Sequence, residues 1–359
     1  MKKVFCVIVC VLILLLLCSC HHAPAVSDTS GTDRQTTTSR QAETTTSGET
    51  KSKTTTTQTT QTVKETKPTP VITTTITSTA AKVTTLITTA TTKPATTPPQ
   101  TSTTAKQGLP PLMYTVNDAE NTRGLATERK GFSFGVAQNG VPHSQSVINQ
   151  QTFDAYENVQ ALALDTKSQD KRLYLTFDNG YEYQNLTADI LDTLKKKQVK
   201  AAFFVTLSYV KKNPQFVQRM IDEGHIVGNH STTHPSFPKL TRAEMAQEIA
   251  TLDNYLREHF SYTSPYFRFP SGEHSECALE LVTSIGFRSV FWSIAHSDWD
   301  TAAQKGADHA FSTVTSRFHP GAVILLHAVS KDNADALDRI IDEARRQGYT
   351  FKTLDEYFG

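Results

Sequence analysis

From residue 171 onward, short apolar runs alternate with segments in which apolar residues recur every three or four positions. The run 172–177 stops at the turn signal 178–180 and predicts a strand, and the leucines and isoleucine of 186–194 recur at helical spacing. The same pattern predicts strands at 201–205, 225–228, 266–268, 288–293 and 322–326, and helices at 216–221, 241–259, 275–285 and 333–347. Strands alternating with helices imply an α/β fold with a parallel sheet, either open or closed into a barrel.

The first third of the chain shows no such pattern. It has no aromatic residue between Phe5 and Tyr114, and 34 of the 76 positions from Thr29 to Thr104 are threonine. Such a segment cannot bury enough apolar surface to offset its ordering entropy. We therefore expect a disordered, Thr-rich linker at 21–107 and a folded region from Gly108. The linker could serve as a spacer or have no specific role.

The N-terminus has the features of an export signal. Two lysines precede an apolar run at 4–17 that is short for a membrane span. The run ends in Leu17-Cys18-Ser19-Cys20, which resembles the lipobox of bacterial lipoproteins, and this implies lipidation at Cys20 and anchoring to the outer face of the cell membrane. An ordinary cleaved signal or an uncleaved anchor are the alternatives. We expect residues 1–20 to be the signal peptide.

The charge balance bears on nucleic-acid binding, and the cysteine content bears on disulfide formation. Basic and acidic residues number 36 and 35, which argues against a nucleic-acid-binding protein with a basic face. Four of five cysteines lie in the signal, so Cys277 has no partner for an internal disulfide and is expected to be a packed core residue.

Polar side chains gather where the predicted strands end. Because parallel strands bring their carboxyl ends to one edge, such residues are candidates for an active site. Each taken alone also fits a structural role, such as a core histidine or an ion pair. The residues in question are Asp178, Asn179, Asn229, His230, Arg268, His296, Asp298 and His327.

The pattern His230-Ser-Thr-Thr-His234 places two imidazoles four residues apart, where they can share one metal ion. This motif is weak by itself. An oxygen ligand from another strand end, Asp178 or Asn179, would complete a three-ligand catalytic site with an open position.

Five motifs in order give the chain a family resemblance: TFDNG (176–180), HSTTH (230–234), RFPSG (268–272), Asp298-Trp299 and Leu326-His327. Residues 171–359 thereby resemble carbohydrate esterase family 4, the NodB-homology polysaccharide deacetylases. The resemblance implies a distorted (β/α) barrel. The segments TFDNGYE (176–182), FWSIAHSDW (291–299) and LLHAVSKDNADAL (325–337) are most similar to the peptidoglycan N-acetylmuramic acid deacetylases, which prepare muramic δ-lactam. That branch also has an extension comparable to residues 108–170.

The resemblance implies roles for individual residues in hydrolysing an acetamide. Asp178 corresponds to the general base, Arg268 to its partner, His327 to the general acid and Asp298 to the carboxylate that raises the basicity of that histidine. The remaining implied roles are metal ligands for His230 and His234, an oxyanion donor for the backbone N–H of Ser271, and a pocket wall for Trp299.

Three positions depart from the family pattern. Asn179 stands where most members have a metal-binding Asp, and its neutral amide oxygen holds a divalent cation such as zinc less tightly. The muramic branch shares this Asn, so activity is compatible with it while metal dependence stays open. Phe269 and Ser271 replace the more usual proline and a bulkier residue, which affects the shape of the pocket.

We therefore expect an exported, monomeric hydrolase that deacetylates N-acetylmuramic acid in peptidoglycan. Two alternatives remain. One is a deacetylase of N-acetylglucosamine or of another acetylated polysaccharide. The other is a wall-binding module without turnover, although a pure binder has no need for a base and an acid together.

Overall fold

The strands form one eight-stranded sheet in the order β1-β6-β5-β4-β3-β2-β7, with β8 paired to β2. This computed structural model describes residues 108–359, so the predicted signal peptide and Thr-rich linker lie outside it. Every ladder between the described strands is parallel, as predicted. The strands are β1 Ala161–Leu162, β2 Arg172–Asn179, β3 Ala202–Val205, β4 Ile226–Asn229, β5 Tyr266–Phe267, β6 Arg288–Val290, β7 Ala322–His327 and β8 Thr350–Lys352.

Strand β2 pairs with three other strands, β3, β7 and β8, and is buried almost along its whole length. Its side chains alternate between the two faces because successive residues of a strand point in opposite directions. Leu173, Leu175 and Phe177 join the cluster of apolar residues that includes the buried faces of α3 and α9. Tyr174 joins the second cluster, on the other face of the sheet. Asp178, two residues beyond Thr176, therefore points to the same face as Tyr174.

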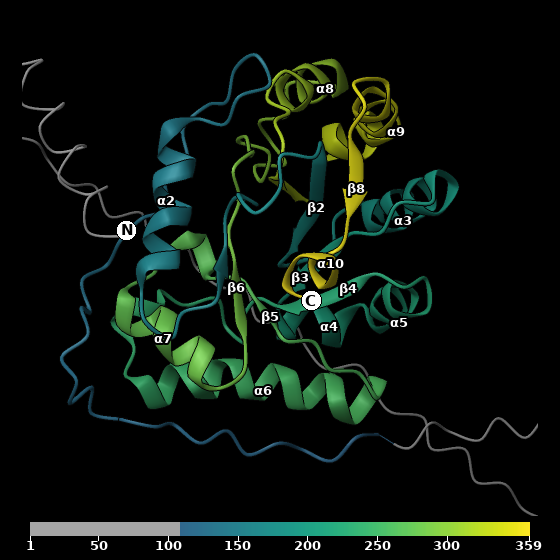
Figure 1. The fold of residues 1–359 in the computed structure, drawn as a ribbon. Helices are drawn as coiled ribbons and strands as arrows, with labels where there is room; N and C mark the ends of the chain where they lie inside the picture. Colours follow the sequence, from purple (N-terminus) through teal and green to yellow (C-terminus); the bar gives the residue numbers. More distant parts are fainter. Residues whose placement is uncertain (1–107) are drawn as a thin grey trace, which may run out of the picture. The chain divides into compact units, whose positions relative to one another are not determined.

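Helices follow one another around the outside of the strands, and α9, α3, α5, α6 and α7 can be traced in this order in Figure 1. Thr241 and Glu244 form the predicted capping box at the start of α6. The helices are α2 Ser144–Ala155, α3 Leu186–Lys197, α4 Leu207–Lys212, α5 Pro214–Asp222, α6 Arg242–Phe260, α7 Glu276–Ser284, α8 Ala307–Thr315, α9 Lys331–Arg346 and α10 Leu354–Phe358, with 3-10 turns η1 Phe237–Lys239 and η2 Pro270–Gly272.

The two ends of the sheet are linked by isolated bridges. Leu164, just beyond β1, bridges to Ala322 of β7, and Ile294, beyond β6, bridges to Ile324 of the same strand. The backbone N–H of Asp165 also donates to the carbonyl of Gly321. These contacts bring β1 and β6 next to β7, as expected for a distorted barrel.

Residues 108–170 pack on the sheet and on α6. Their strand β1 pairs with β6, and the Tyr114 hydroxyl donates to Asp253 of α6 at 2.6 Å. The Gln150 side chain accepts hydrogen bonds from the backbone N–H groups of Ala163 and Leu164 at 2.8 and 3.1 Å. The segment thus contributes a strand and a helix to the same layered unit.

Four helices and one strand were not predicted: α2, α4, α8, α10 and β8. Strand β8 has three residues and α4 has six, so neither is long enough to show a period. No helix in residues 108–359 is both long enough and apolar enough to cross a membrane.

Candidate active site

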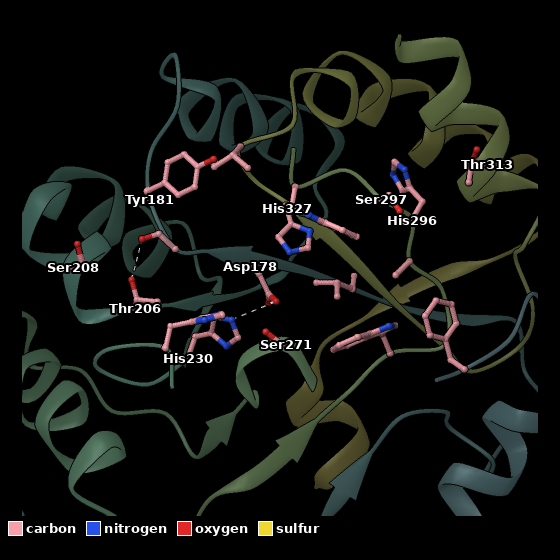
Figure 2. A pocket seen from close by; sticks show the side chains of 18 of the residues that line it. Asp178, Tyr181, Thr206, Ser208, His230, Ser271, His296, Ser297, Thr313 and His327 are labelled. Carbon is pink, nitrogen blue, oxygen red and sulfur yellow. Dashed lines mark hydrogen bonds and ion pairs between the residues drawn. The ribbon is translucent and has the colours of Figure 1, made fainter. Parts of the chain in front are cut away.

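Asp178 and His327 lie side by side at the carboxyl ends of two hydrogen-bonded strands. They are register partners in the ladder between β2 and β7, although 149 positions separate them in the sequence. Both side chains line one cavity of about 1190 Å³. Figure 2 shows them facing each other there, with His230 and Ser271 close by. The proposed base and acid therefore share one space.

The Asp178 carboxylate forms a buried ion pair with Arg268. Oδ1 of Asp178 lies 2.8 Å from Nη1 of Arg268, and the two residues are 7% and 0% exposed. Burial acts to raise the pKa of Asp178, but the charges of Arg268, His230 and His327 outweigh it and hold that pKa below its ordinary value. Asp178 is therefore ionised at neutral pH.

The Arg268 guanidinium is fixed by several hydrogen bonds. Nε donates to the carbonyl of Val290, and Nη2 donates to the Thr176 hydroxyl at 2.9 Å and to the carbonyl of Phe291. Its plane also lies 4.2 Å from the centre of the Phe204 ring. An arginine held in this way keeps one orientation and can position the Asp178 carboxylate.

His230 follows β4 and faces Asp178. Its Nδ1 lies 2.8 Å from the carbonyl oxygen of Arg268, which can only accept, so Nδ1 carries the proton. Burial lowers the pKa of His230 to about 4, so Nε2 is an unprotonated acceptor at neutral pH. This nitrogen lies 3.6 Å from Oδ2 of Asp178, and a proton donor or a cation would have to mediate between the two acceptors.

His234 lies next to His230 on the rim of the cavity. The two rings are 4.9 Å apart between centroids and nearly perpendicular. His234 has a φ of 62° and its N–H donates to the Ser231 hydroxyl, so a tight turn and not a helix brings the two imidazoles together. The Glu248 carboxylate closes this turn by accepting from the N–H groups of Thr232 and Thr233.

Asn179 is fully buried and is not among the residues that line the cavity. Its Nδ2 lies 3.4 Å from the Thr187 hydroxyl, and its Oδ1 has no hydrogen-bond partner among the described residues. A buried amide oxygen without a partner can act as a ligand for a divalent cation, but Asn179 does not line the cavity that contains His230 and His234. Within 108–359, no group of three or more His, Cys, Asp or Glu side chains is placed to hold a metal ion.

Asp298 holds His327 from two sides. Its Oδ1 accepts from Nδ1 of His327 at 2.7 Å, and its Oδ2 accepts from the backbone N–H of the same residue at 2.9 Å. Asn333, in the first turn of α9, also donates to Oδ2 and accepts from Nε2 of His296. The bond to Asp298 places the proton on Nδ1 and leaves Nε2 for the substrate.

The charges around His327 favour its protonated form, which can act as a general acid. Burial acts to lower the pKa of His327, but the hydrogen bond and charge of Asp298, together with the charge of Asp178, raise it above the ordinary value. Trp299 is 56% exposed, and its ring lies 6.0 Å from the His327 ring. Ser271 is exposed, and its backbone is in the left-handed region with a φ of 55°. Trp299 and Ser271 both line the cavity.

The structure thus brings Asp178, Arg268, His230, His234, Asp298, His327, Ser271 and Trp299 to one cavity or to its direct support, and it places Asn179 behind it. Sequence reasoning missed Asn333 and Thr176 as supports. Both are small polar residues within segments that carry the family resemblance, 176–180 and 325–337, which was the available signal. Arg317, which also lines the cavity, was missed because it follows no predicted strand.

Comparisons with known proteins show the family and the fold of the chain. The polysaccharide deacetylase family model matches residues 165–290. The peptidoglycan-N-acetylmuramic acid deacetylase PdaA of Bacillus subtilis is 45% identical over 193 residues, which cover 53% of this chain and 72% of the relative. A peptidoglycan-N-acetylglucosamine deacetylase of Bacillus cereus is 35% identical over 188 residues, covering 51% and 67%. The solved structure of PdaA, a family 4 carbohydrate esterase, matches with a TM-score of 0.59 and 38% identity, covering 65% of this chain and 98% of that one.

Proposed function

Because the chain belongs to the carbohydrate esterase family 4 polysaccharide deacetylases, we propose that it removes the acetyl group from N-acetylmuramic acid residues of peptidoglycan. As a family member it is a hydrolase of cell-wall polysaccharide. The main support for the proposal is that Asp178 and His327 are register partners on neighbouring strands. Each also has a charged partner, Arg268 for Asp178 and Asp298 for His327. The muramic preference is supported by the 45% identity to PdaA.

The reaction begins with a water molecule between Asp178 and the acetamide carbonyl. Water attacks the carbonyl carbon and transfers a proton to Oδ2 of Asp178, the oxygen that Arg268 leaves free. Arg268 keeps Asp178 ionised but also makes it a weak base. The attack therefore depends on groups that stabilise the developing oxyanion, for which the backbone N–H of Ser271 is the candidate.

The tetrahedral intermediate then collapses with cleavage of the carbon–nitrogen bond. The leaving amine needs a proton, and Nε2 of His327 supplies it as the general acid. Asp298 stabilises the imidazolium before the transfer and fixes its orientation. The products are acetate and a free amino sugar.

We further propose that His230 and His234 bind a divalent cation, with Oδ1 of Asn179 as the third candidate ligand. The support is the unprotonated Nε2 of His230 and the buried acceptor of Asn179, which lacks a partner among the described side chains. A bound cation would polarise the acetamide carbonyl and acidify the attacking water. Zinc titration of chelator-treated protein by calorimetry should show binding that His230→Ala removes, and unchanged affinity in that variant would contradict the assignment.

For the remaining organisation, we propose a lipid anchor at Cys20, a linker at 21–107 and one monomeric catalytic unit formed by 108–170 and 171–359. Labelling with a radioactive fatty acid, compared between the natural chain and Cys20→Ala, tests the anchor. Sedimentation of residues 108–359 tests the monomer.

Mass spectrometry of muropeptides tests the function directly. Peptidoglycan treated with the protein should lose 42 Da per deacetylated sugar, a mass that follows from replacing acetyl by hydrogen, and fragmentation should place the loss on muramic acid. Loss from N-acetylglucosamine would support the alternative substrate instead. No acetate release from any cell-wall polysaccharide would refute the proposed enzyme.

A further inference from the structure

The cavity has a strongly uneven charge. Asp178 is the only Asp or Glu side chain among its described lining residues, and Arg268 already pairs with it. The lining also includes Lys305, Arg317 and the five histidines 230, 234, 296, 309 and 327. The volume of about 1190 Å³ far exceeds what an acetamide group needs. The part of the cavity beyond the acid–base pair therefore suits an anionic portion of a substrate.

The charged side chain of Arg317 lies near one face of α8, together with two polar side chains. His309, Thr313 and Arg317 are spaced at i, i+4 and i+8, so they lie on the same side of the helix and its C-terminal extension, and all three line the cavity. Figure 2 shows Thr313 and His296 on one side of His327, and Thr206, Ser208 and His230 on the other. The α8 side is thus separate from His230 of the HSTTH motif.

Arg317 has no acidic partner among residues 108–359. The one hydrogen bond of its side chain to these residues is from Nη1 to the carbonyl of Ala295, at 2.7 Å. The side chain is half-buried, and this burial lowers the pKa of Arg317 without any compensating charge. By contrast, the partly buried Arg219 pairs with Glu223 and the buried Arg242 pairs with Glu280. A desolvated guanidinium without a counter-charge lowers the stability of the ligand-free protein. An anionic ligand would supply the missing counter-charge.

The bond to Ala295 connects Arg317 to the catalytic loop. Ala295 lies three residues before Asp298, and Ile294 pairs with β7 just ahead of His327. A group bound by Arg317 would therefore lie in the same cavity as the general acid. The remaining guanidinium N–H groups are free to bind a carboxylate in the paired geometry that arginine favours.

We propose that Arg317 forms a carboxylate subsite with the α8 face, and that this subsite selects substrates carrying a carboxylate next to the acetamido sugar. The inference rests on the proposed deacetylase function and deepens it. In N-acetylmuramic acid the lactyl ether is on C3, adjacent to the acetamide on C2, and its carboxyl group is free when no stem peptide is attached. Stem peptides offer a second source of carboxylates. N-acetylglucosamine oligomers have neither.

The experiment compares the full chain with Arg317→Gln, Arg317→Lys and Thr313→Glu on three substrates. These are glycan strands freed of stem peptides, the same strands with their peptides, and neutral N-acetylglucosamine oligomers. Arg346→Gln is the matched control, because it removes one positive charge at an exposed ion pair outside the cavity. Acetate release gives kcat and KM, and calorimetry gives the affinity for each substrate independently of turnover.

We expect Arg317→Gln to raise KM for a carboxylate substrate about 10- to 100-fold with little change in kcat, as for loss of a charged hydrogen bond. Neutral oligomers should change less than about twofold. Arg317→Lys should retain part of the affinity, and Arg346→Gln all of it. Thr313→Glu, which leaves the Ala295 bond in place, should weaken the same substrates by supplying a competing carboxylate.

The pattern across substrates identifies the source. A loss confined to peptide-free strands assigns the lactyl carboxylate, and a loss confined to peptide-bearing strands assigns the stem peptide. An equal loss on all three, or a lower kcat at unchanged KM, would overturn the subsite and leave Arg317 as a support of the Ala295 loop. If the natural chain releases no acetate from any substrate, the proposed function fails, while the calorimetric comparison still decides the subsite.

Discussion

Replacing Asp298 with asparagine should disable the general acid while keeping the shape of the site. Asp298 is 2% exposed and accepts three hydrogen bonds, from Nδ1 of His327, from the backbone N–H of His327 and from Asn333. An asparagine has one acceptor oxygen and one amide nitrogen in place of the two carboxylate oxygens. Its oxygen can accept hydrogen bonds, but its amide nitrogen can only donate, and the side chain has no charge to stabilise the imidazolium.

The size of the effect follows from the bond that is lost. A hydrogen bond between a charged pair contributes about 1.5–3 kcal/mol, and removing it from the acid form corresponds to roughly 10- to 100-fold in kcat near neutral pH.

The direction of the pH effect follows from the pKa of His327. Its pKa is raised in the folded protein, mainly by Asp298 acting against burial, so Asp298→Asn lowers it. Since the reaction needs protonated His327, the alkaline limb of the kcat profile should move to lower pH.

The assay is acetate release from muramic acid strands between pH 5 and 10, with Asp300→Asn as the control. Asp300 is exposed, lies two residues away and accepts only from its own turn, so its variant should match the natural chain. Stability offers a second readout. A raised histidine pKa stabilises the fold fully below the ordinary value near 6.5, and this contribution is lost as pH rises through the folded pKa. The two variants should therefore differ more in unfolding free energy at pH 6 than at pH 9. An unmoved alkaline limb in Asp298→Asn would refute the acid assignment.

Three further substitutions test the supporting parts of the site and fold. Asp178→Asn should abolish nearly all acetate release with a circular dichroism spectrum like that of the natural chain, and undiminished release would exclude Asp178 as the base. Arg268→Ala should lower the unfolding free energy by about 3–5 kcal/mol in urea titrations, because it leaves the buried Asp178 carboxylate unpaired; a loss below about 1 kcal/mol would contradict the buried pair. Burial lowers the pKa of His225 to about 4, so the unfolded chain binds protons more readily and stability should fall as pH drops from about 6.5 to 4. His225→Gln should flatten that slope, and an unchanged slope would show that other groups produce it.

Much of the catalytic site was predictable because its residues follow strands that are easy to recognise. Asp178, His230 and His327 each come at or just after a buried apolar run, and parallel strands bring such positions to one edge. The capping box at Thr241 was equally local, since it needs only two residues three apart. The family motifs then suggested which of these residues act on the substrate.

The supports of the site could not be predicted in this way. Asn333 reaches Asp298 from the first turn of α9, 35 positions away, and Thr176 reaches Arg268 from β2, 92 positions away. Neither contact leaves a periodic signal, because each depends on how two elements pack. The HSTTH turn was also ambiguous, since a helix or a tight turn can present two imidazoles together, and only the positive φ of His234 decides for the turn.

The sequence by itself determined the alternation of strands and helices and the chemical types of the groups proposed to react, because hydrophobic period and motif spacing are local properties. Tertiary structure alone decided which face of β2 holds Asp178 and how the ends of the sheet approach each other. It also decided that Arg317 lies in the same cavity as His327 with no acidic partner among the described residues. These features depend on burial and on contacts between segments that are distant in the sequence. Both arise only when the chain packs into its tertiary structure.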